Sequence, residues 1–104
     1  MSKKRRKTIV VNRKVDYEDV YIGRGSPFGN KYIIGKDGNR QECIEKYKVW
    51  FYKRLKKPRF KRAVEALRGR RLGCSCKPKA CHGDIIVEYL ERQENEDSVA
   101  VFFE

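Results

Sequence analysis

The stretch CSCKPKACHGD, from Cys74 to Asp84, holds three of the chain's four cysteines and its only histidine. Thiols and an imidazole this close together are typical of a metal centre, a reactive thiol or a disulfide. A disulfide is the least favoured of these, because disulfides form in oxidising compartments and a bridge between Cys74 and Cys76 would be strained. The sequence therefore leaves a metal site, a thiol site and purely structural cysteines as alternatives.

The thiol alternative depends on the position of this stretch between a short strand and a helix that begins near residues 81–84. A thiol at the start of a helix faces the positive end of the helix dipole, which lowers its pKa. Cys81 is then the candidate nucleophile and His82 a candidate general acid or base. Asp84 is expected to orient His82 or to act as a polar anchor.

The metal alternative uses Cys74, Cys76, Cys81 and His82 as four ligands, which in number and type suit zinc. Their spacing fits less well, because structural zinc sites usually separate paired ligands by two to four residues. Neighbouring residues at the start of a helix point about 100° apart, so Cys81 and His82 are hard to aim at one ion.

A second polar stretch, YIGRGSPFGN, begins at Tyr21 and reads as a loop after a strand. Its glycines, Gly29 among them, permit close approach of the backbone to a ligand, and Arg24 is suited to pair with a phosphate or carboxylate. Ser26 and Asn30 add polar groups. The competing interpretation is a tight turn with Arg24 in solvent, and the spacing matches neither a P-loop nor a dinucleotide-binding fingerprint.

The elements that position these two loops follow from the hydrophobic pattern. Helices are expected at residues 40–56, capped by Asn39 and Glu42, at residues 58–69, and from residues 81–84 to Leu90. Cys43 is expected to be a buried apolar residue of the first helix. Strands are expected at residues 8–12, 20–23 and 71–76, with two weaker candidates at residues 31–35 and, after an acidic break at residues 93–98, at residues 99–103.

This order of elements predicts a single α/β domain with a small, at least partly parallel sheet and about three helices. Residues 9–104 are expected to form the domain, and residues 1–8 a basic flexible arm. The formal net charge is +12, of which five charges lie in Lys3–Lys7, so the rest of the chain is also basic. Such a surface favours anionic partners: a nucleotide or other anionic ligand, and nucleic acid.

Three segments together resemble a small family of phages and prokaryotes known as a domain of unknown function. They are VVN, VYIGRGSPFGN and LRGRRLGCSCKPKACHGD, and the resemblance runs from about Val10 to Leu90. The family pattern has an Ile-Gly-Arg, a Gly-Asn-Pro, an Arg that opens the long helix, a Leu-Arg-Gly, and a Cys-x-Cys followed by Cys-His. Lys31 stands where the family usually has proline.

The resemblance implies an α/β domain in which signature residues converge from the two loops: Asn12, Arg24, Asn30, Arg40, Cys81 and His82. It points to a composite polar pocket for a nucleotide-like or phosphate-bearing ligand. Catalysis stays open, and the alternative function is a zinc-stabilised, non-catalytic nucleic-acid-binding module. No apolar segment reaches the length of a membrane span and no signal peptide is recognisable, so we expect a cytoplasmic protein without a membrane partner, located in the host cytoplasm if a phage encodes it.

Overall fold

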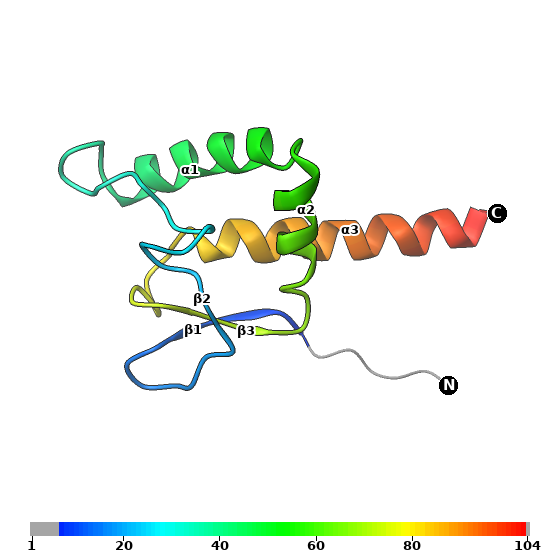
Figure 1. Ribbon diagram of the computed structural model, residues 1–104, viewed down its shortest axis with the longest axis horizontal. Helices are drawn as coiled ribbons and strands as arrows, with labels where there is room; N and C mark the ends of the chain where they lie inside the picture. The colour runs from blue at the N-terminus through cyan, green and yellow to red at the C-terminus, as the bar shows by residue number, and fades with distance from the viewer. Residues whose placement is uncertain (1–6, 104) are drawn as a thin grey trace.

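The computed structural model describes the backbone of residues 7–103 and the side chains of residues 7–94, so most of the predicted arm at residues 1–8 lies outside the described residues. Three strands and three helices follow one another along the described chain (Figure 1). They are β1 (Ile9–Asn12), β2 (Val20–Tyr21), α1 (Arg40–Arg54), α2 (Pro58–Glu65), β3 (Arg71–Cys74) and α3 (Gly83–Phe103).

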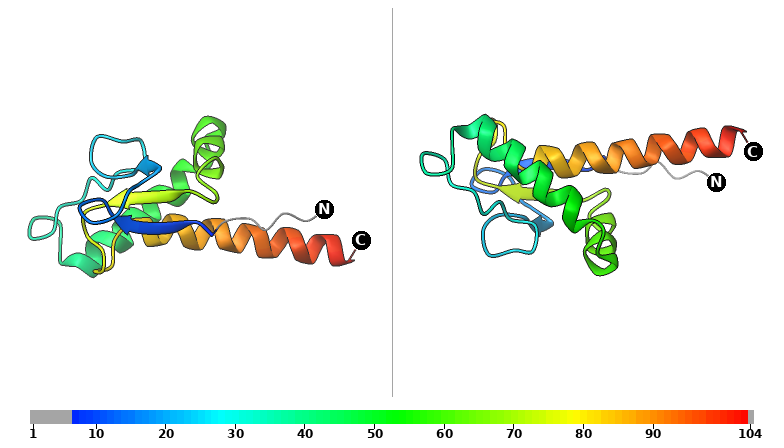
Figure 2. Two further views of the ribbon diagram at one scale, coloured as in Figure 1. Left: turned by 90° about the horizontal axis from the view of Figure 1, so that it is seen from below. Right: turned by 90° about the horizontal axis from the view of Figure 1, so that it is seen from above.

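The three strands form a parallel sheet in the order β1-β3-β2, so the last strand in the sequence lies in the centre. Figure 1 and Figure 2 both show that the three helices lie on one face of this sheet. This arrangement confirms the predicted α/β class with a small sheet, and every described strand pair is parallel.

The two faces of the sheet differ because neighbouring residues of a strand point to opposite sides. Leu72 of β3 pairs with Val10 and Val20, and all three side chains pack into the helix-covered core. Gly73 points to the other face, where a Cβ atom would overlap the Glu18 carboxylate. A glycine is therefore needed there, since the connection from β1 to β2 passes directly over the central strand.

Local capping explains where the first two helices begin. The Asn39 side chain accepts a hydrogen bond from the Glu42 amide at 2.8 Å, and the Glu42 carboxylate accepts one from the Asn39 amide at 2.8 Å, which confirms the predicted capping box. Pro58 occupies the first turn of α2, where its missing N–H costs nothing. The second helix ends at Glu65, earlier than predicted, and a turn leads to Gly69 with a φ of +79°.

The two weaker strand predictions are both wrong. Residues 31–35 form a loop, because the Asp37 carboxylate accepts a hydrogen bond from the Ile33 amide and Gly35 and Gly38 take positive φ angles of 95° and 136°, which close a turn. Residues 93–103 continue α3 as helix. The acidic stretch does not break that helix because it contains neither proline nor glycine, the residues that most strongly interrupt helices.

The core lies between the helices and the covered face of the sheet. Its fully buried side chains include Tyr47 and Phe51 of α1, Leu72 of β3 and Ile86 of α3. Cys43 is only 2% exposed, which confirms its prediction as a buried residue of the first helix. Within the described part of the chain, no helix combines the length and the apolarity that crossing a membrane requires.

Candidate functional site

A pocket of about 440 Å³ lies beside the carboxyl ends of β2 and β3 and the first turns of α1. Ligand sites of open parallel sheets are found at this edge, because the loops that leave the strands meet there. The lining residues come from the loop after β2, the start of α1 and the loop after β3: Tyr21, Gly23, Arg24, Asn30, Tyr32, Ile33, Ile34, Arg40, Cys43, Ile44, Cys74, Ser75, Cys76, Ala80, Cys81 and His82.

The two polar loops singled out in the sequence therefore meet at one pocket. The predicted site residues that line it are Arg24, Asn30, Arg40, Cys74, Cys76, Cys81 and His82. The predicted residues that lie outside the lining are Asn12, Ser26, Gly29 and Asp84.

The predicted residues outside the lining shape the loops that form it. The Asn12 amide donates a hydrogen bond to the Lys77 carbonyl oxygen at 2.7 Å and so ties the end of β1 to the loop after β3. The Ser26 hydroxyl donates to the Gly23 carbonyl oxygen at 2.7 Å. A Cβ atom on Gly29 would lie 2.6 Å from that same carbonyl oxygen, so the fold of this loop requires a glycine.

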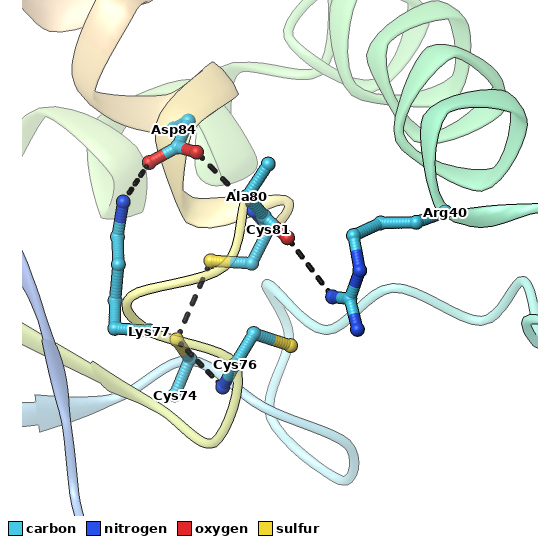
Figure 3. A network of polar contacts seen from close by, with 7 residues as sticks. All are labelled: Arg40, Cys74, Cys76, Lys77, Ala80, Cys81 and Asp84. Carbon is cyan, nitrogen blue, oxygen red and sulfur yellow. Dashed lines mark hydrogen bonds and ion pairs between the residues drawn. The ribbon is translucent and has the colours of Figure 1, made fainter.

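The polar side chains of the pocket are cationic or neutral. Arg24 is exposed and has no hydrogen bond or ion pair with the residues that the structure describes, whereas the Arg40 Nη1 atom donates to the Ala80 carbonyl oxygen at 3.0 Å (Figure 3). The Asn30 side chain accepts from the Tyr32 amide at 2.9 Å. No Asp or Glu is among the described lining residues, so nothing in the lining neutralises the two arginines.

Three of the thiols that line the pocket come from the end of β3 and the loop after it: Cys74, Cys76 and Cys81. The Sγ atoms of Cys74 and Cys81 are 3.3 Å apart and both residues are buried, while the Cys76 amide donates to the Cys74 sulfur at 3.4 Å. The Cys76 side chain is half-buried and points away from the other two sulfur atoms (Figure 3). All of these cysteines are free thiols.

The predicted lowering of the Cys81 pKa is wrong. Burial, and after it the hydrogen bond and electrostatic interaction with Cys74, raise the pKa of this thiol to about 12. The backbone amide of Gly83 at the start of α3 lowers it, as expected for a helix N-terminus, but this effect is smaller than the cost of burying a thiolate. Cys81 is therefore protonated at neutral pH.

His82 lines the pocket and joins the loop after β3 to the loop after β2. Its Nε2 atom lies 2.7 Å from the Ile22 carbonyl oxygen, and because a carbonyl oxygen can only accept, Nε2 carries the proton and donates. The ring also meets the Tyr47 ring edge-on, with centroids 5.0 Å apart. Burial lowers the pKa of His82 below its ordinary value of 6.5, against smaller opposite effects of Ile22 and Asp84.

Asp84 serves as a polar anchor, one of the two predicted roles. One carboxylate oxygen accepts a hydrogen bond from Lys77 Nζ at 2.7 Å, and the other accepts from the Cys81 amide at 3.2 Å. The hydrogen bond to Asp84 raises the pKa of Lys77, despite its partial burial. The anchor fixes both ends of the loop that carries the Cys-Lys-Pro-Lys segment (Figure 3).

The observed arrangement does not fit a zinc centre with the four predicted ligands. The His82 ring is directed to Ile22, whereas the Cys81 sulfur is directed to Cys74, so the adjacent residues diverge as their spacing predicted. In the part of the chain that the structure describes, no group of three or more His, Cys, Asp or Glu side chains is placed to hold a metal ion.

Sequence reasoning missed the apolar half of the lining. Tyr21 and Tyr32 supply aromatic rings, and Ile33, Ile34 and Ile44 supply aliphatic surface. Ile33 and Ile34 are 38% and 50% exposed, which is unusual for neighbouring isoleucines. The available signal was the pair of isoleucines between an Asn-Lys-Tyr and a Gly-Lys-Asp-Gly turn, and the assignment of this segment to a strand concealed it.

A family described as a domain of unknown function (DUF4326) matches residues 2–92 of the chain. An uncharacterized 12.4 kDa protein in the nrdA-td intergenic region of Enterobacteria phage T4 is 47% identical over 90 residues, which cover 85% of this chain and 82% of the relative. No solved structure is significantly similar to this chain. The resemblance to a small phage family is therefore confirmed.

Alkylation should distinguish the four thiols of the folded protein. We expect iodoacetamide at pH 7 to 8 to modify Cys76 first, because it is half-buried while Cys43, Cys74 and Cys81 are buried. Peptide mapping by mass spectrometry measures the order, and a sample unfolded in urea, in which all four react, is the control. Faster modification of Cys81 than of Cys76 would contradict this assignment.

The buried His82 should make stability depend on pH. Its pKa is lowered in the folded state, so the unfolded chain binds a proton first as the pH falls below about 6.5. The free energy of unfolding is expected to decrease below that pH, with a slope of up to about 1.4 kcal/mol per pH unit. His82 is the only histidine of the chain.

Urea unfolding of the wild type and of His82→Gln between pH 5.5 and 7.5 measures this dependence. The variant should be less stable and should lose the slope, because glutamine does not titrate. An equal slope in both proteins would assign the dependence to other groups.

Proposed function

The chain belongs to the family described as a domain of unknown function (DUF4326), and on this premise we propose that its pocket binds a small, phosphate-bearing, nucleotide-like ligand. One observation carries the proposal: two arginines line a pocket that has no carboxylate among its described lining residues and that also offers tyrosine and isoleucine side chains beside the thiols. A cationic side joined to an apolar, aromatic side matches a ligand with a phosphate and a planar ring.

The phosphate is assigned to Arg24 and Arg40. A guanidinium group presents its N–H donors in a planar fork that matches phosphate oxygens. Arg24 donates no hydrogen bond to the described protein, and Arg40 donates one, to Ala80. Donors of both residues are therefore available to a ligand. The bond from Arg40 to Ala80 also holds its guanidinium at the pocket, which reduces the entropy lost on binding.

The planar part of the ligand is assigned to the aromatic and aliphatic side. The volume of about 440 Å³ lies within the usual range of roughly 300 to 1,000 Å³ for small-molecule pockets. Tyr21 and Tyr32 offer rings for contact with a base, and cations lie close to both rings: the Arg13 guanidinium is 4.6 Å from the Tyr21 centroid, and Lys31 is 5.5 Å from that of Tyr32. These cations add to the positive potential around the pocket.

The proposal is one of binding and includes no chemical step. Cys81 is protonated at neutral pH because burial raises its pKa, and the donor Nε2 of His82 is already bonded to Ile22. Both residues support the wall of the pocket in this proposal, and a nucleophilic role for Cys81 stays a prediction. The phage relative leads us to propose the host cytoplasm, where nucleotides are abundant, as the place of binding.

Isothermal titration of the full chain with AMP, GMP, ATP, GTP and inorganic phosphate tests the proposal. We expect at least one nucleotide to bind, and Arg24→Gln to weaken it about 10- to 100-fold, since a charge-assisted hydrogen bond contributes about 1.5 to 3 kcal/mol. Arg24 is exposed and forms no hydrogen bond or ion pair with the described residues, so this variant should keep the stability of the wild type.

Arg70→Gln is the matched control, because it removes the same charge from an exposed position just before β3 that does not line the pocket. Its affinity should stay within about twofold of the wild type. Absence of binding for every compound, or an equal loss in the two variants, would reject a phosphate site at Arg24.

A further inference from the structure

A second concentration of positive charge lies where α1 turns into α2. Six of the nine residues from 54 to 62 are lysine or arginine, and all six side chains are exposed. We call this surface the basic corner; it consists of Arg54, Lys56, Lys57, Arg59, Lys61 and Arg62. The pocket does not use any of these residues.

The charges of the basic corner are not compensated by the described protein. None of the six side chains forms an ion pair with a carboxylate of the described residues, whereas Arg68 and Arg71 pair with Glu94 at 3.2 Å and Asp16 at 3.8 Å. The sequence contains no Asp or Glu from residue 46 to residue 64. Uncompensated charges of one sign repel one another, and a bound polyanion would relieve this repulsion.

The fold displays these cations on a rigid support. Phe60 and Val64 anchor α2 in the core, at 7% and 0% exposure, so its opposite face with Arg59, Lys61 and Arg62 is turned to solvent. Phe60 packs against three aromatic rings of the core. The Arg54 guanidinium lies 5.7 Å from the centroids of both Trp50 and Phe60, which limits its freedom.

The basic corner and the pocket lie at opposite ends of α1. Arg40 and Ile44 at the start of α1 line the pocket, whereas Arg54 of the basic corner is the last residue of the helix. The helix has 15 residues, so its two ends are about 20 Å apart. Figure 1 shows α2 beside the last turn of α1, away from the loops of the pocket. One site can therefore be altered without the other.

We propose that the basic corner binds the phosphate backbone of nucleic acid, a function beyond that of the pocket. Six cations on one rigid turn can meet several successive phosphates, and such contacts require no particular base sequence. A membrane surface fits less well, because interfacial helices expose large apolar side chains beside their cations, and the apolar side chains of α2, Phe60 and Val64, are buried.

Fluorescence anisotropy with labelled oligonucleotides of about 20 residues tests the proposal, with duplex DNA, single-stranded DNA and RNA as separate arms. The test variant carries Lys57→Gln, Arg59→Gln, Lys61→Gln and Arg62→Gln. We expect the wild type to bind at least one of these nucleic acids with an affinity that falls as salt rises. The variant should bind at least about tenfold more weakly, with a salt slope smaller by about 2 to 4.

The control variant carries Lys14→Gln, Lys36→Gln, Lys48→Gln and Lys79→Gln, four exposed lysines elsewhere on the protein. It removes the same net charge and should keep most of the affinity and salt slope of the wild type. Circular dichroism establishes that both variants are folded. An equal loss of affinity in both variants would mean that nucleic acid responds to the net charge of the protein and not to the basic corner. No binding at low salt, or binding to phosphatidylglycerol vesicles but not to nucleic acid, would overturn the proposal.

Discussion

The buried hydrogen bond from His82 to the Ile22 carbonyl oxygen, at 2.7 Å, is the contact on which the pocket depends. It joins the start of α3 to the end of β2, so it sets the distance between the two loops. The Tyr47 ring packs edge-on against His82, and its hydroxyl donates to the Phe28 carbonyl oxygen at 2.8 Å. These two polar contacts fix both loops against α1, and a buried donor left without its acceptor would cost about 1 to 3 kcal/mol.

This junction brings cysteines and a histidine close together while it directs the His82 ring and the Cys81 sulfur to different partners. A three-stranded parallel sheet offers a single edge where loops converge, and the buried side chains at that edge must be either hydrogen-bonded or apolar. His82 is bonded to Ile22, and Asp84 is bonded to Lys77 and to the Cys81 amide. The buried Cys74 and Cys81 thiols lie beside these bonds, with their sulfur atoms 3.3 Å apart.

The sequence predicted the elements that rest on strong local signals. The capping box at Asn39, the apolar stripe of α1 and the strand that ends at Cys74 have the predicted type and nearly the predicted bounds. The prediction of strands failed in two segments. In residues 31–35 the glycines and the Asp37 side chain favour a turn, and residues 99–103 continue the preceding helix, although both segments have high β propensity. At the site, seven predicted residues meet at the pocket. The predicted direction of the Cys81 pKa shift was wrong, because hydrophobic periodicity locates the start of a helix but does not show how deeply that start is buried.

The central claim is that an anionic ligand occupies the pocket at the edge of the sheet, and amide chemical shifts test it directly. In a ¹H–¹⁵N titration of the full chain with the nucleotide that binds, the largest shifts are expected for the amides of residues 23–30 and 75–81, the two loops of the pocket. The amides of residues 56–62 should move little. Shifts concentrated in residues 56–62 would place the anion on the basic corner and contradict the claim.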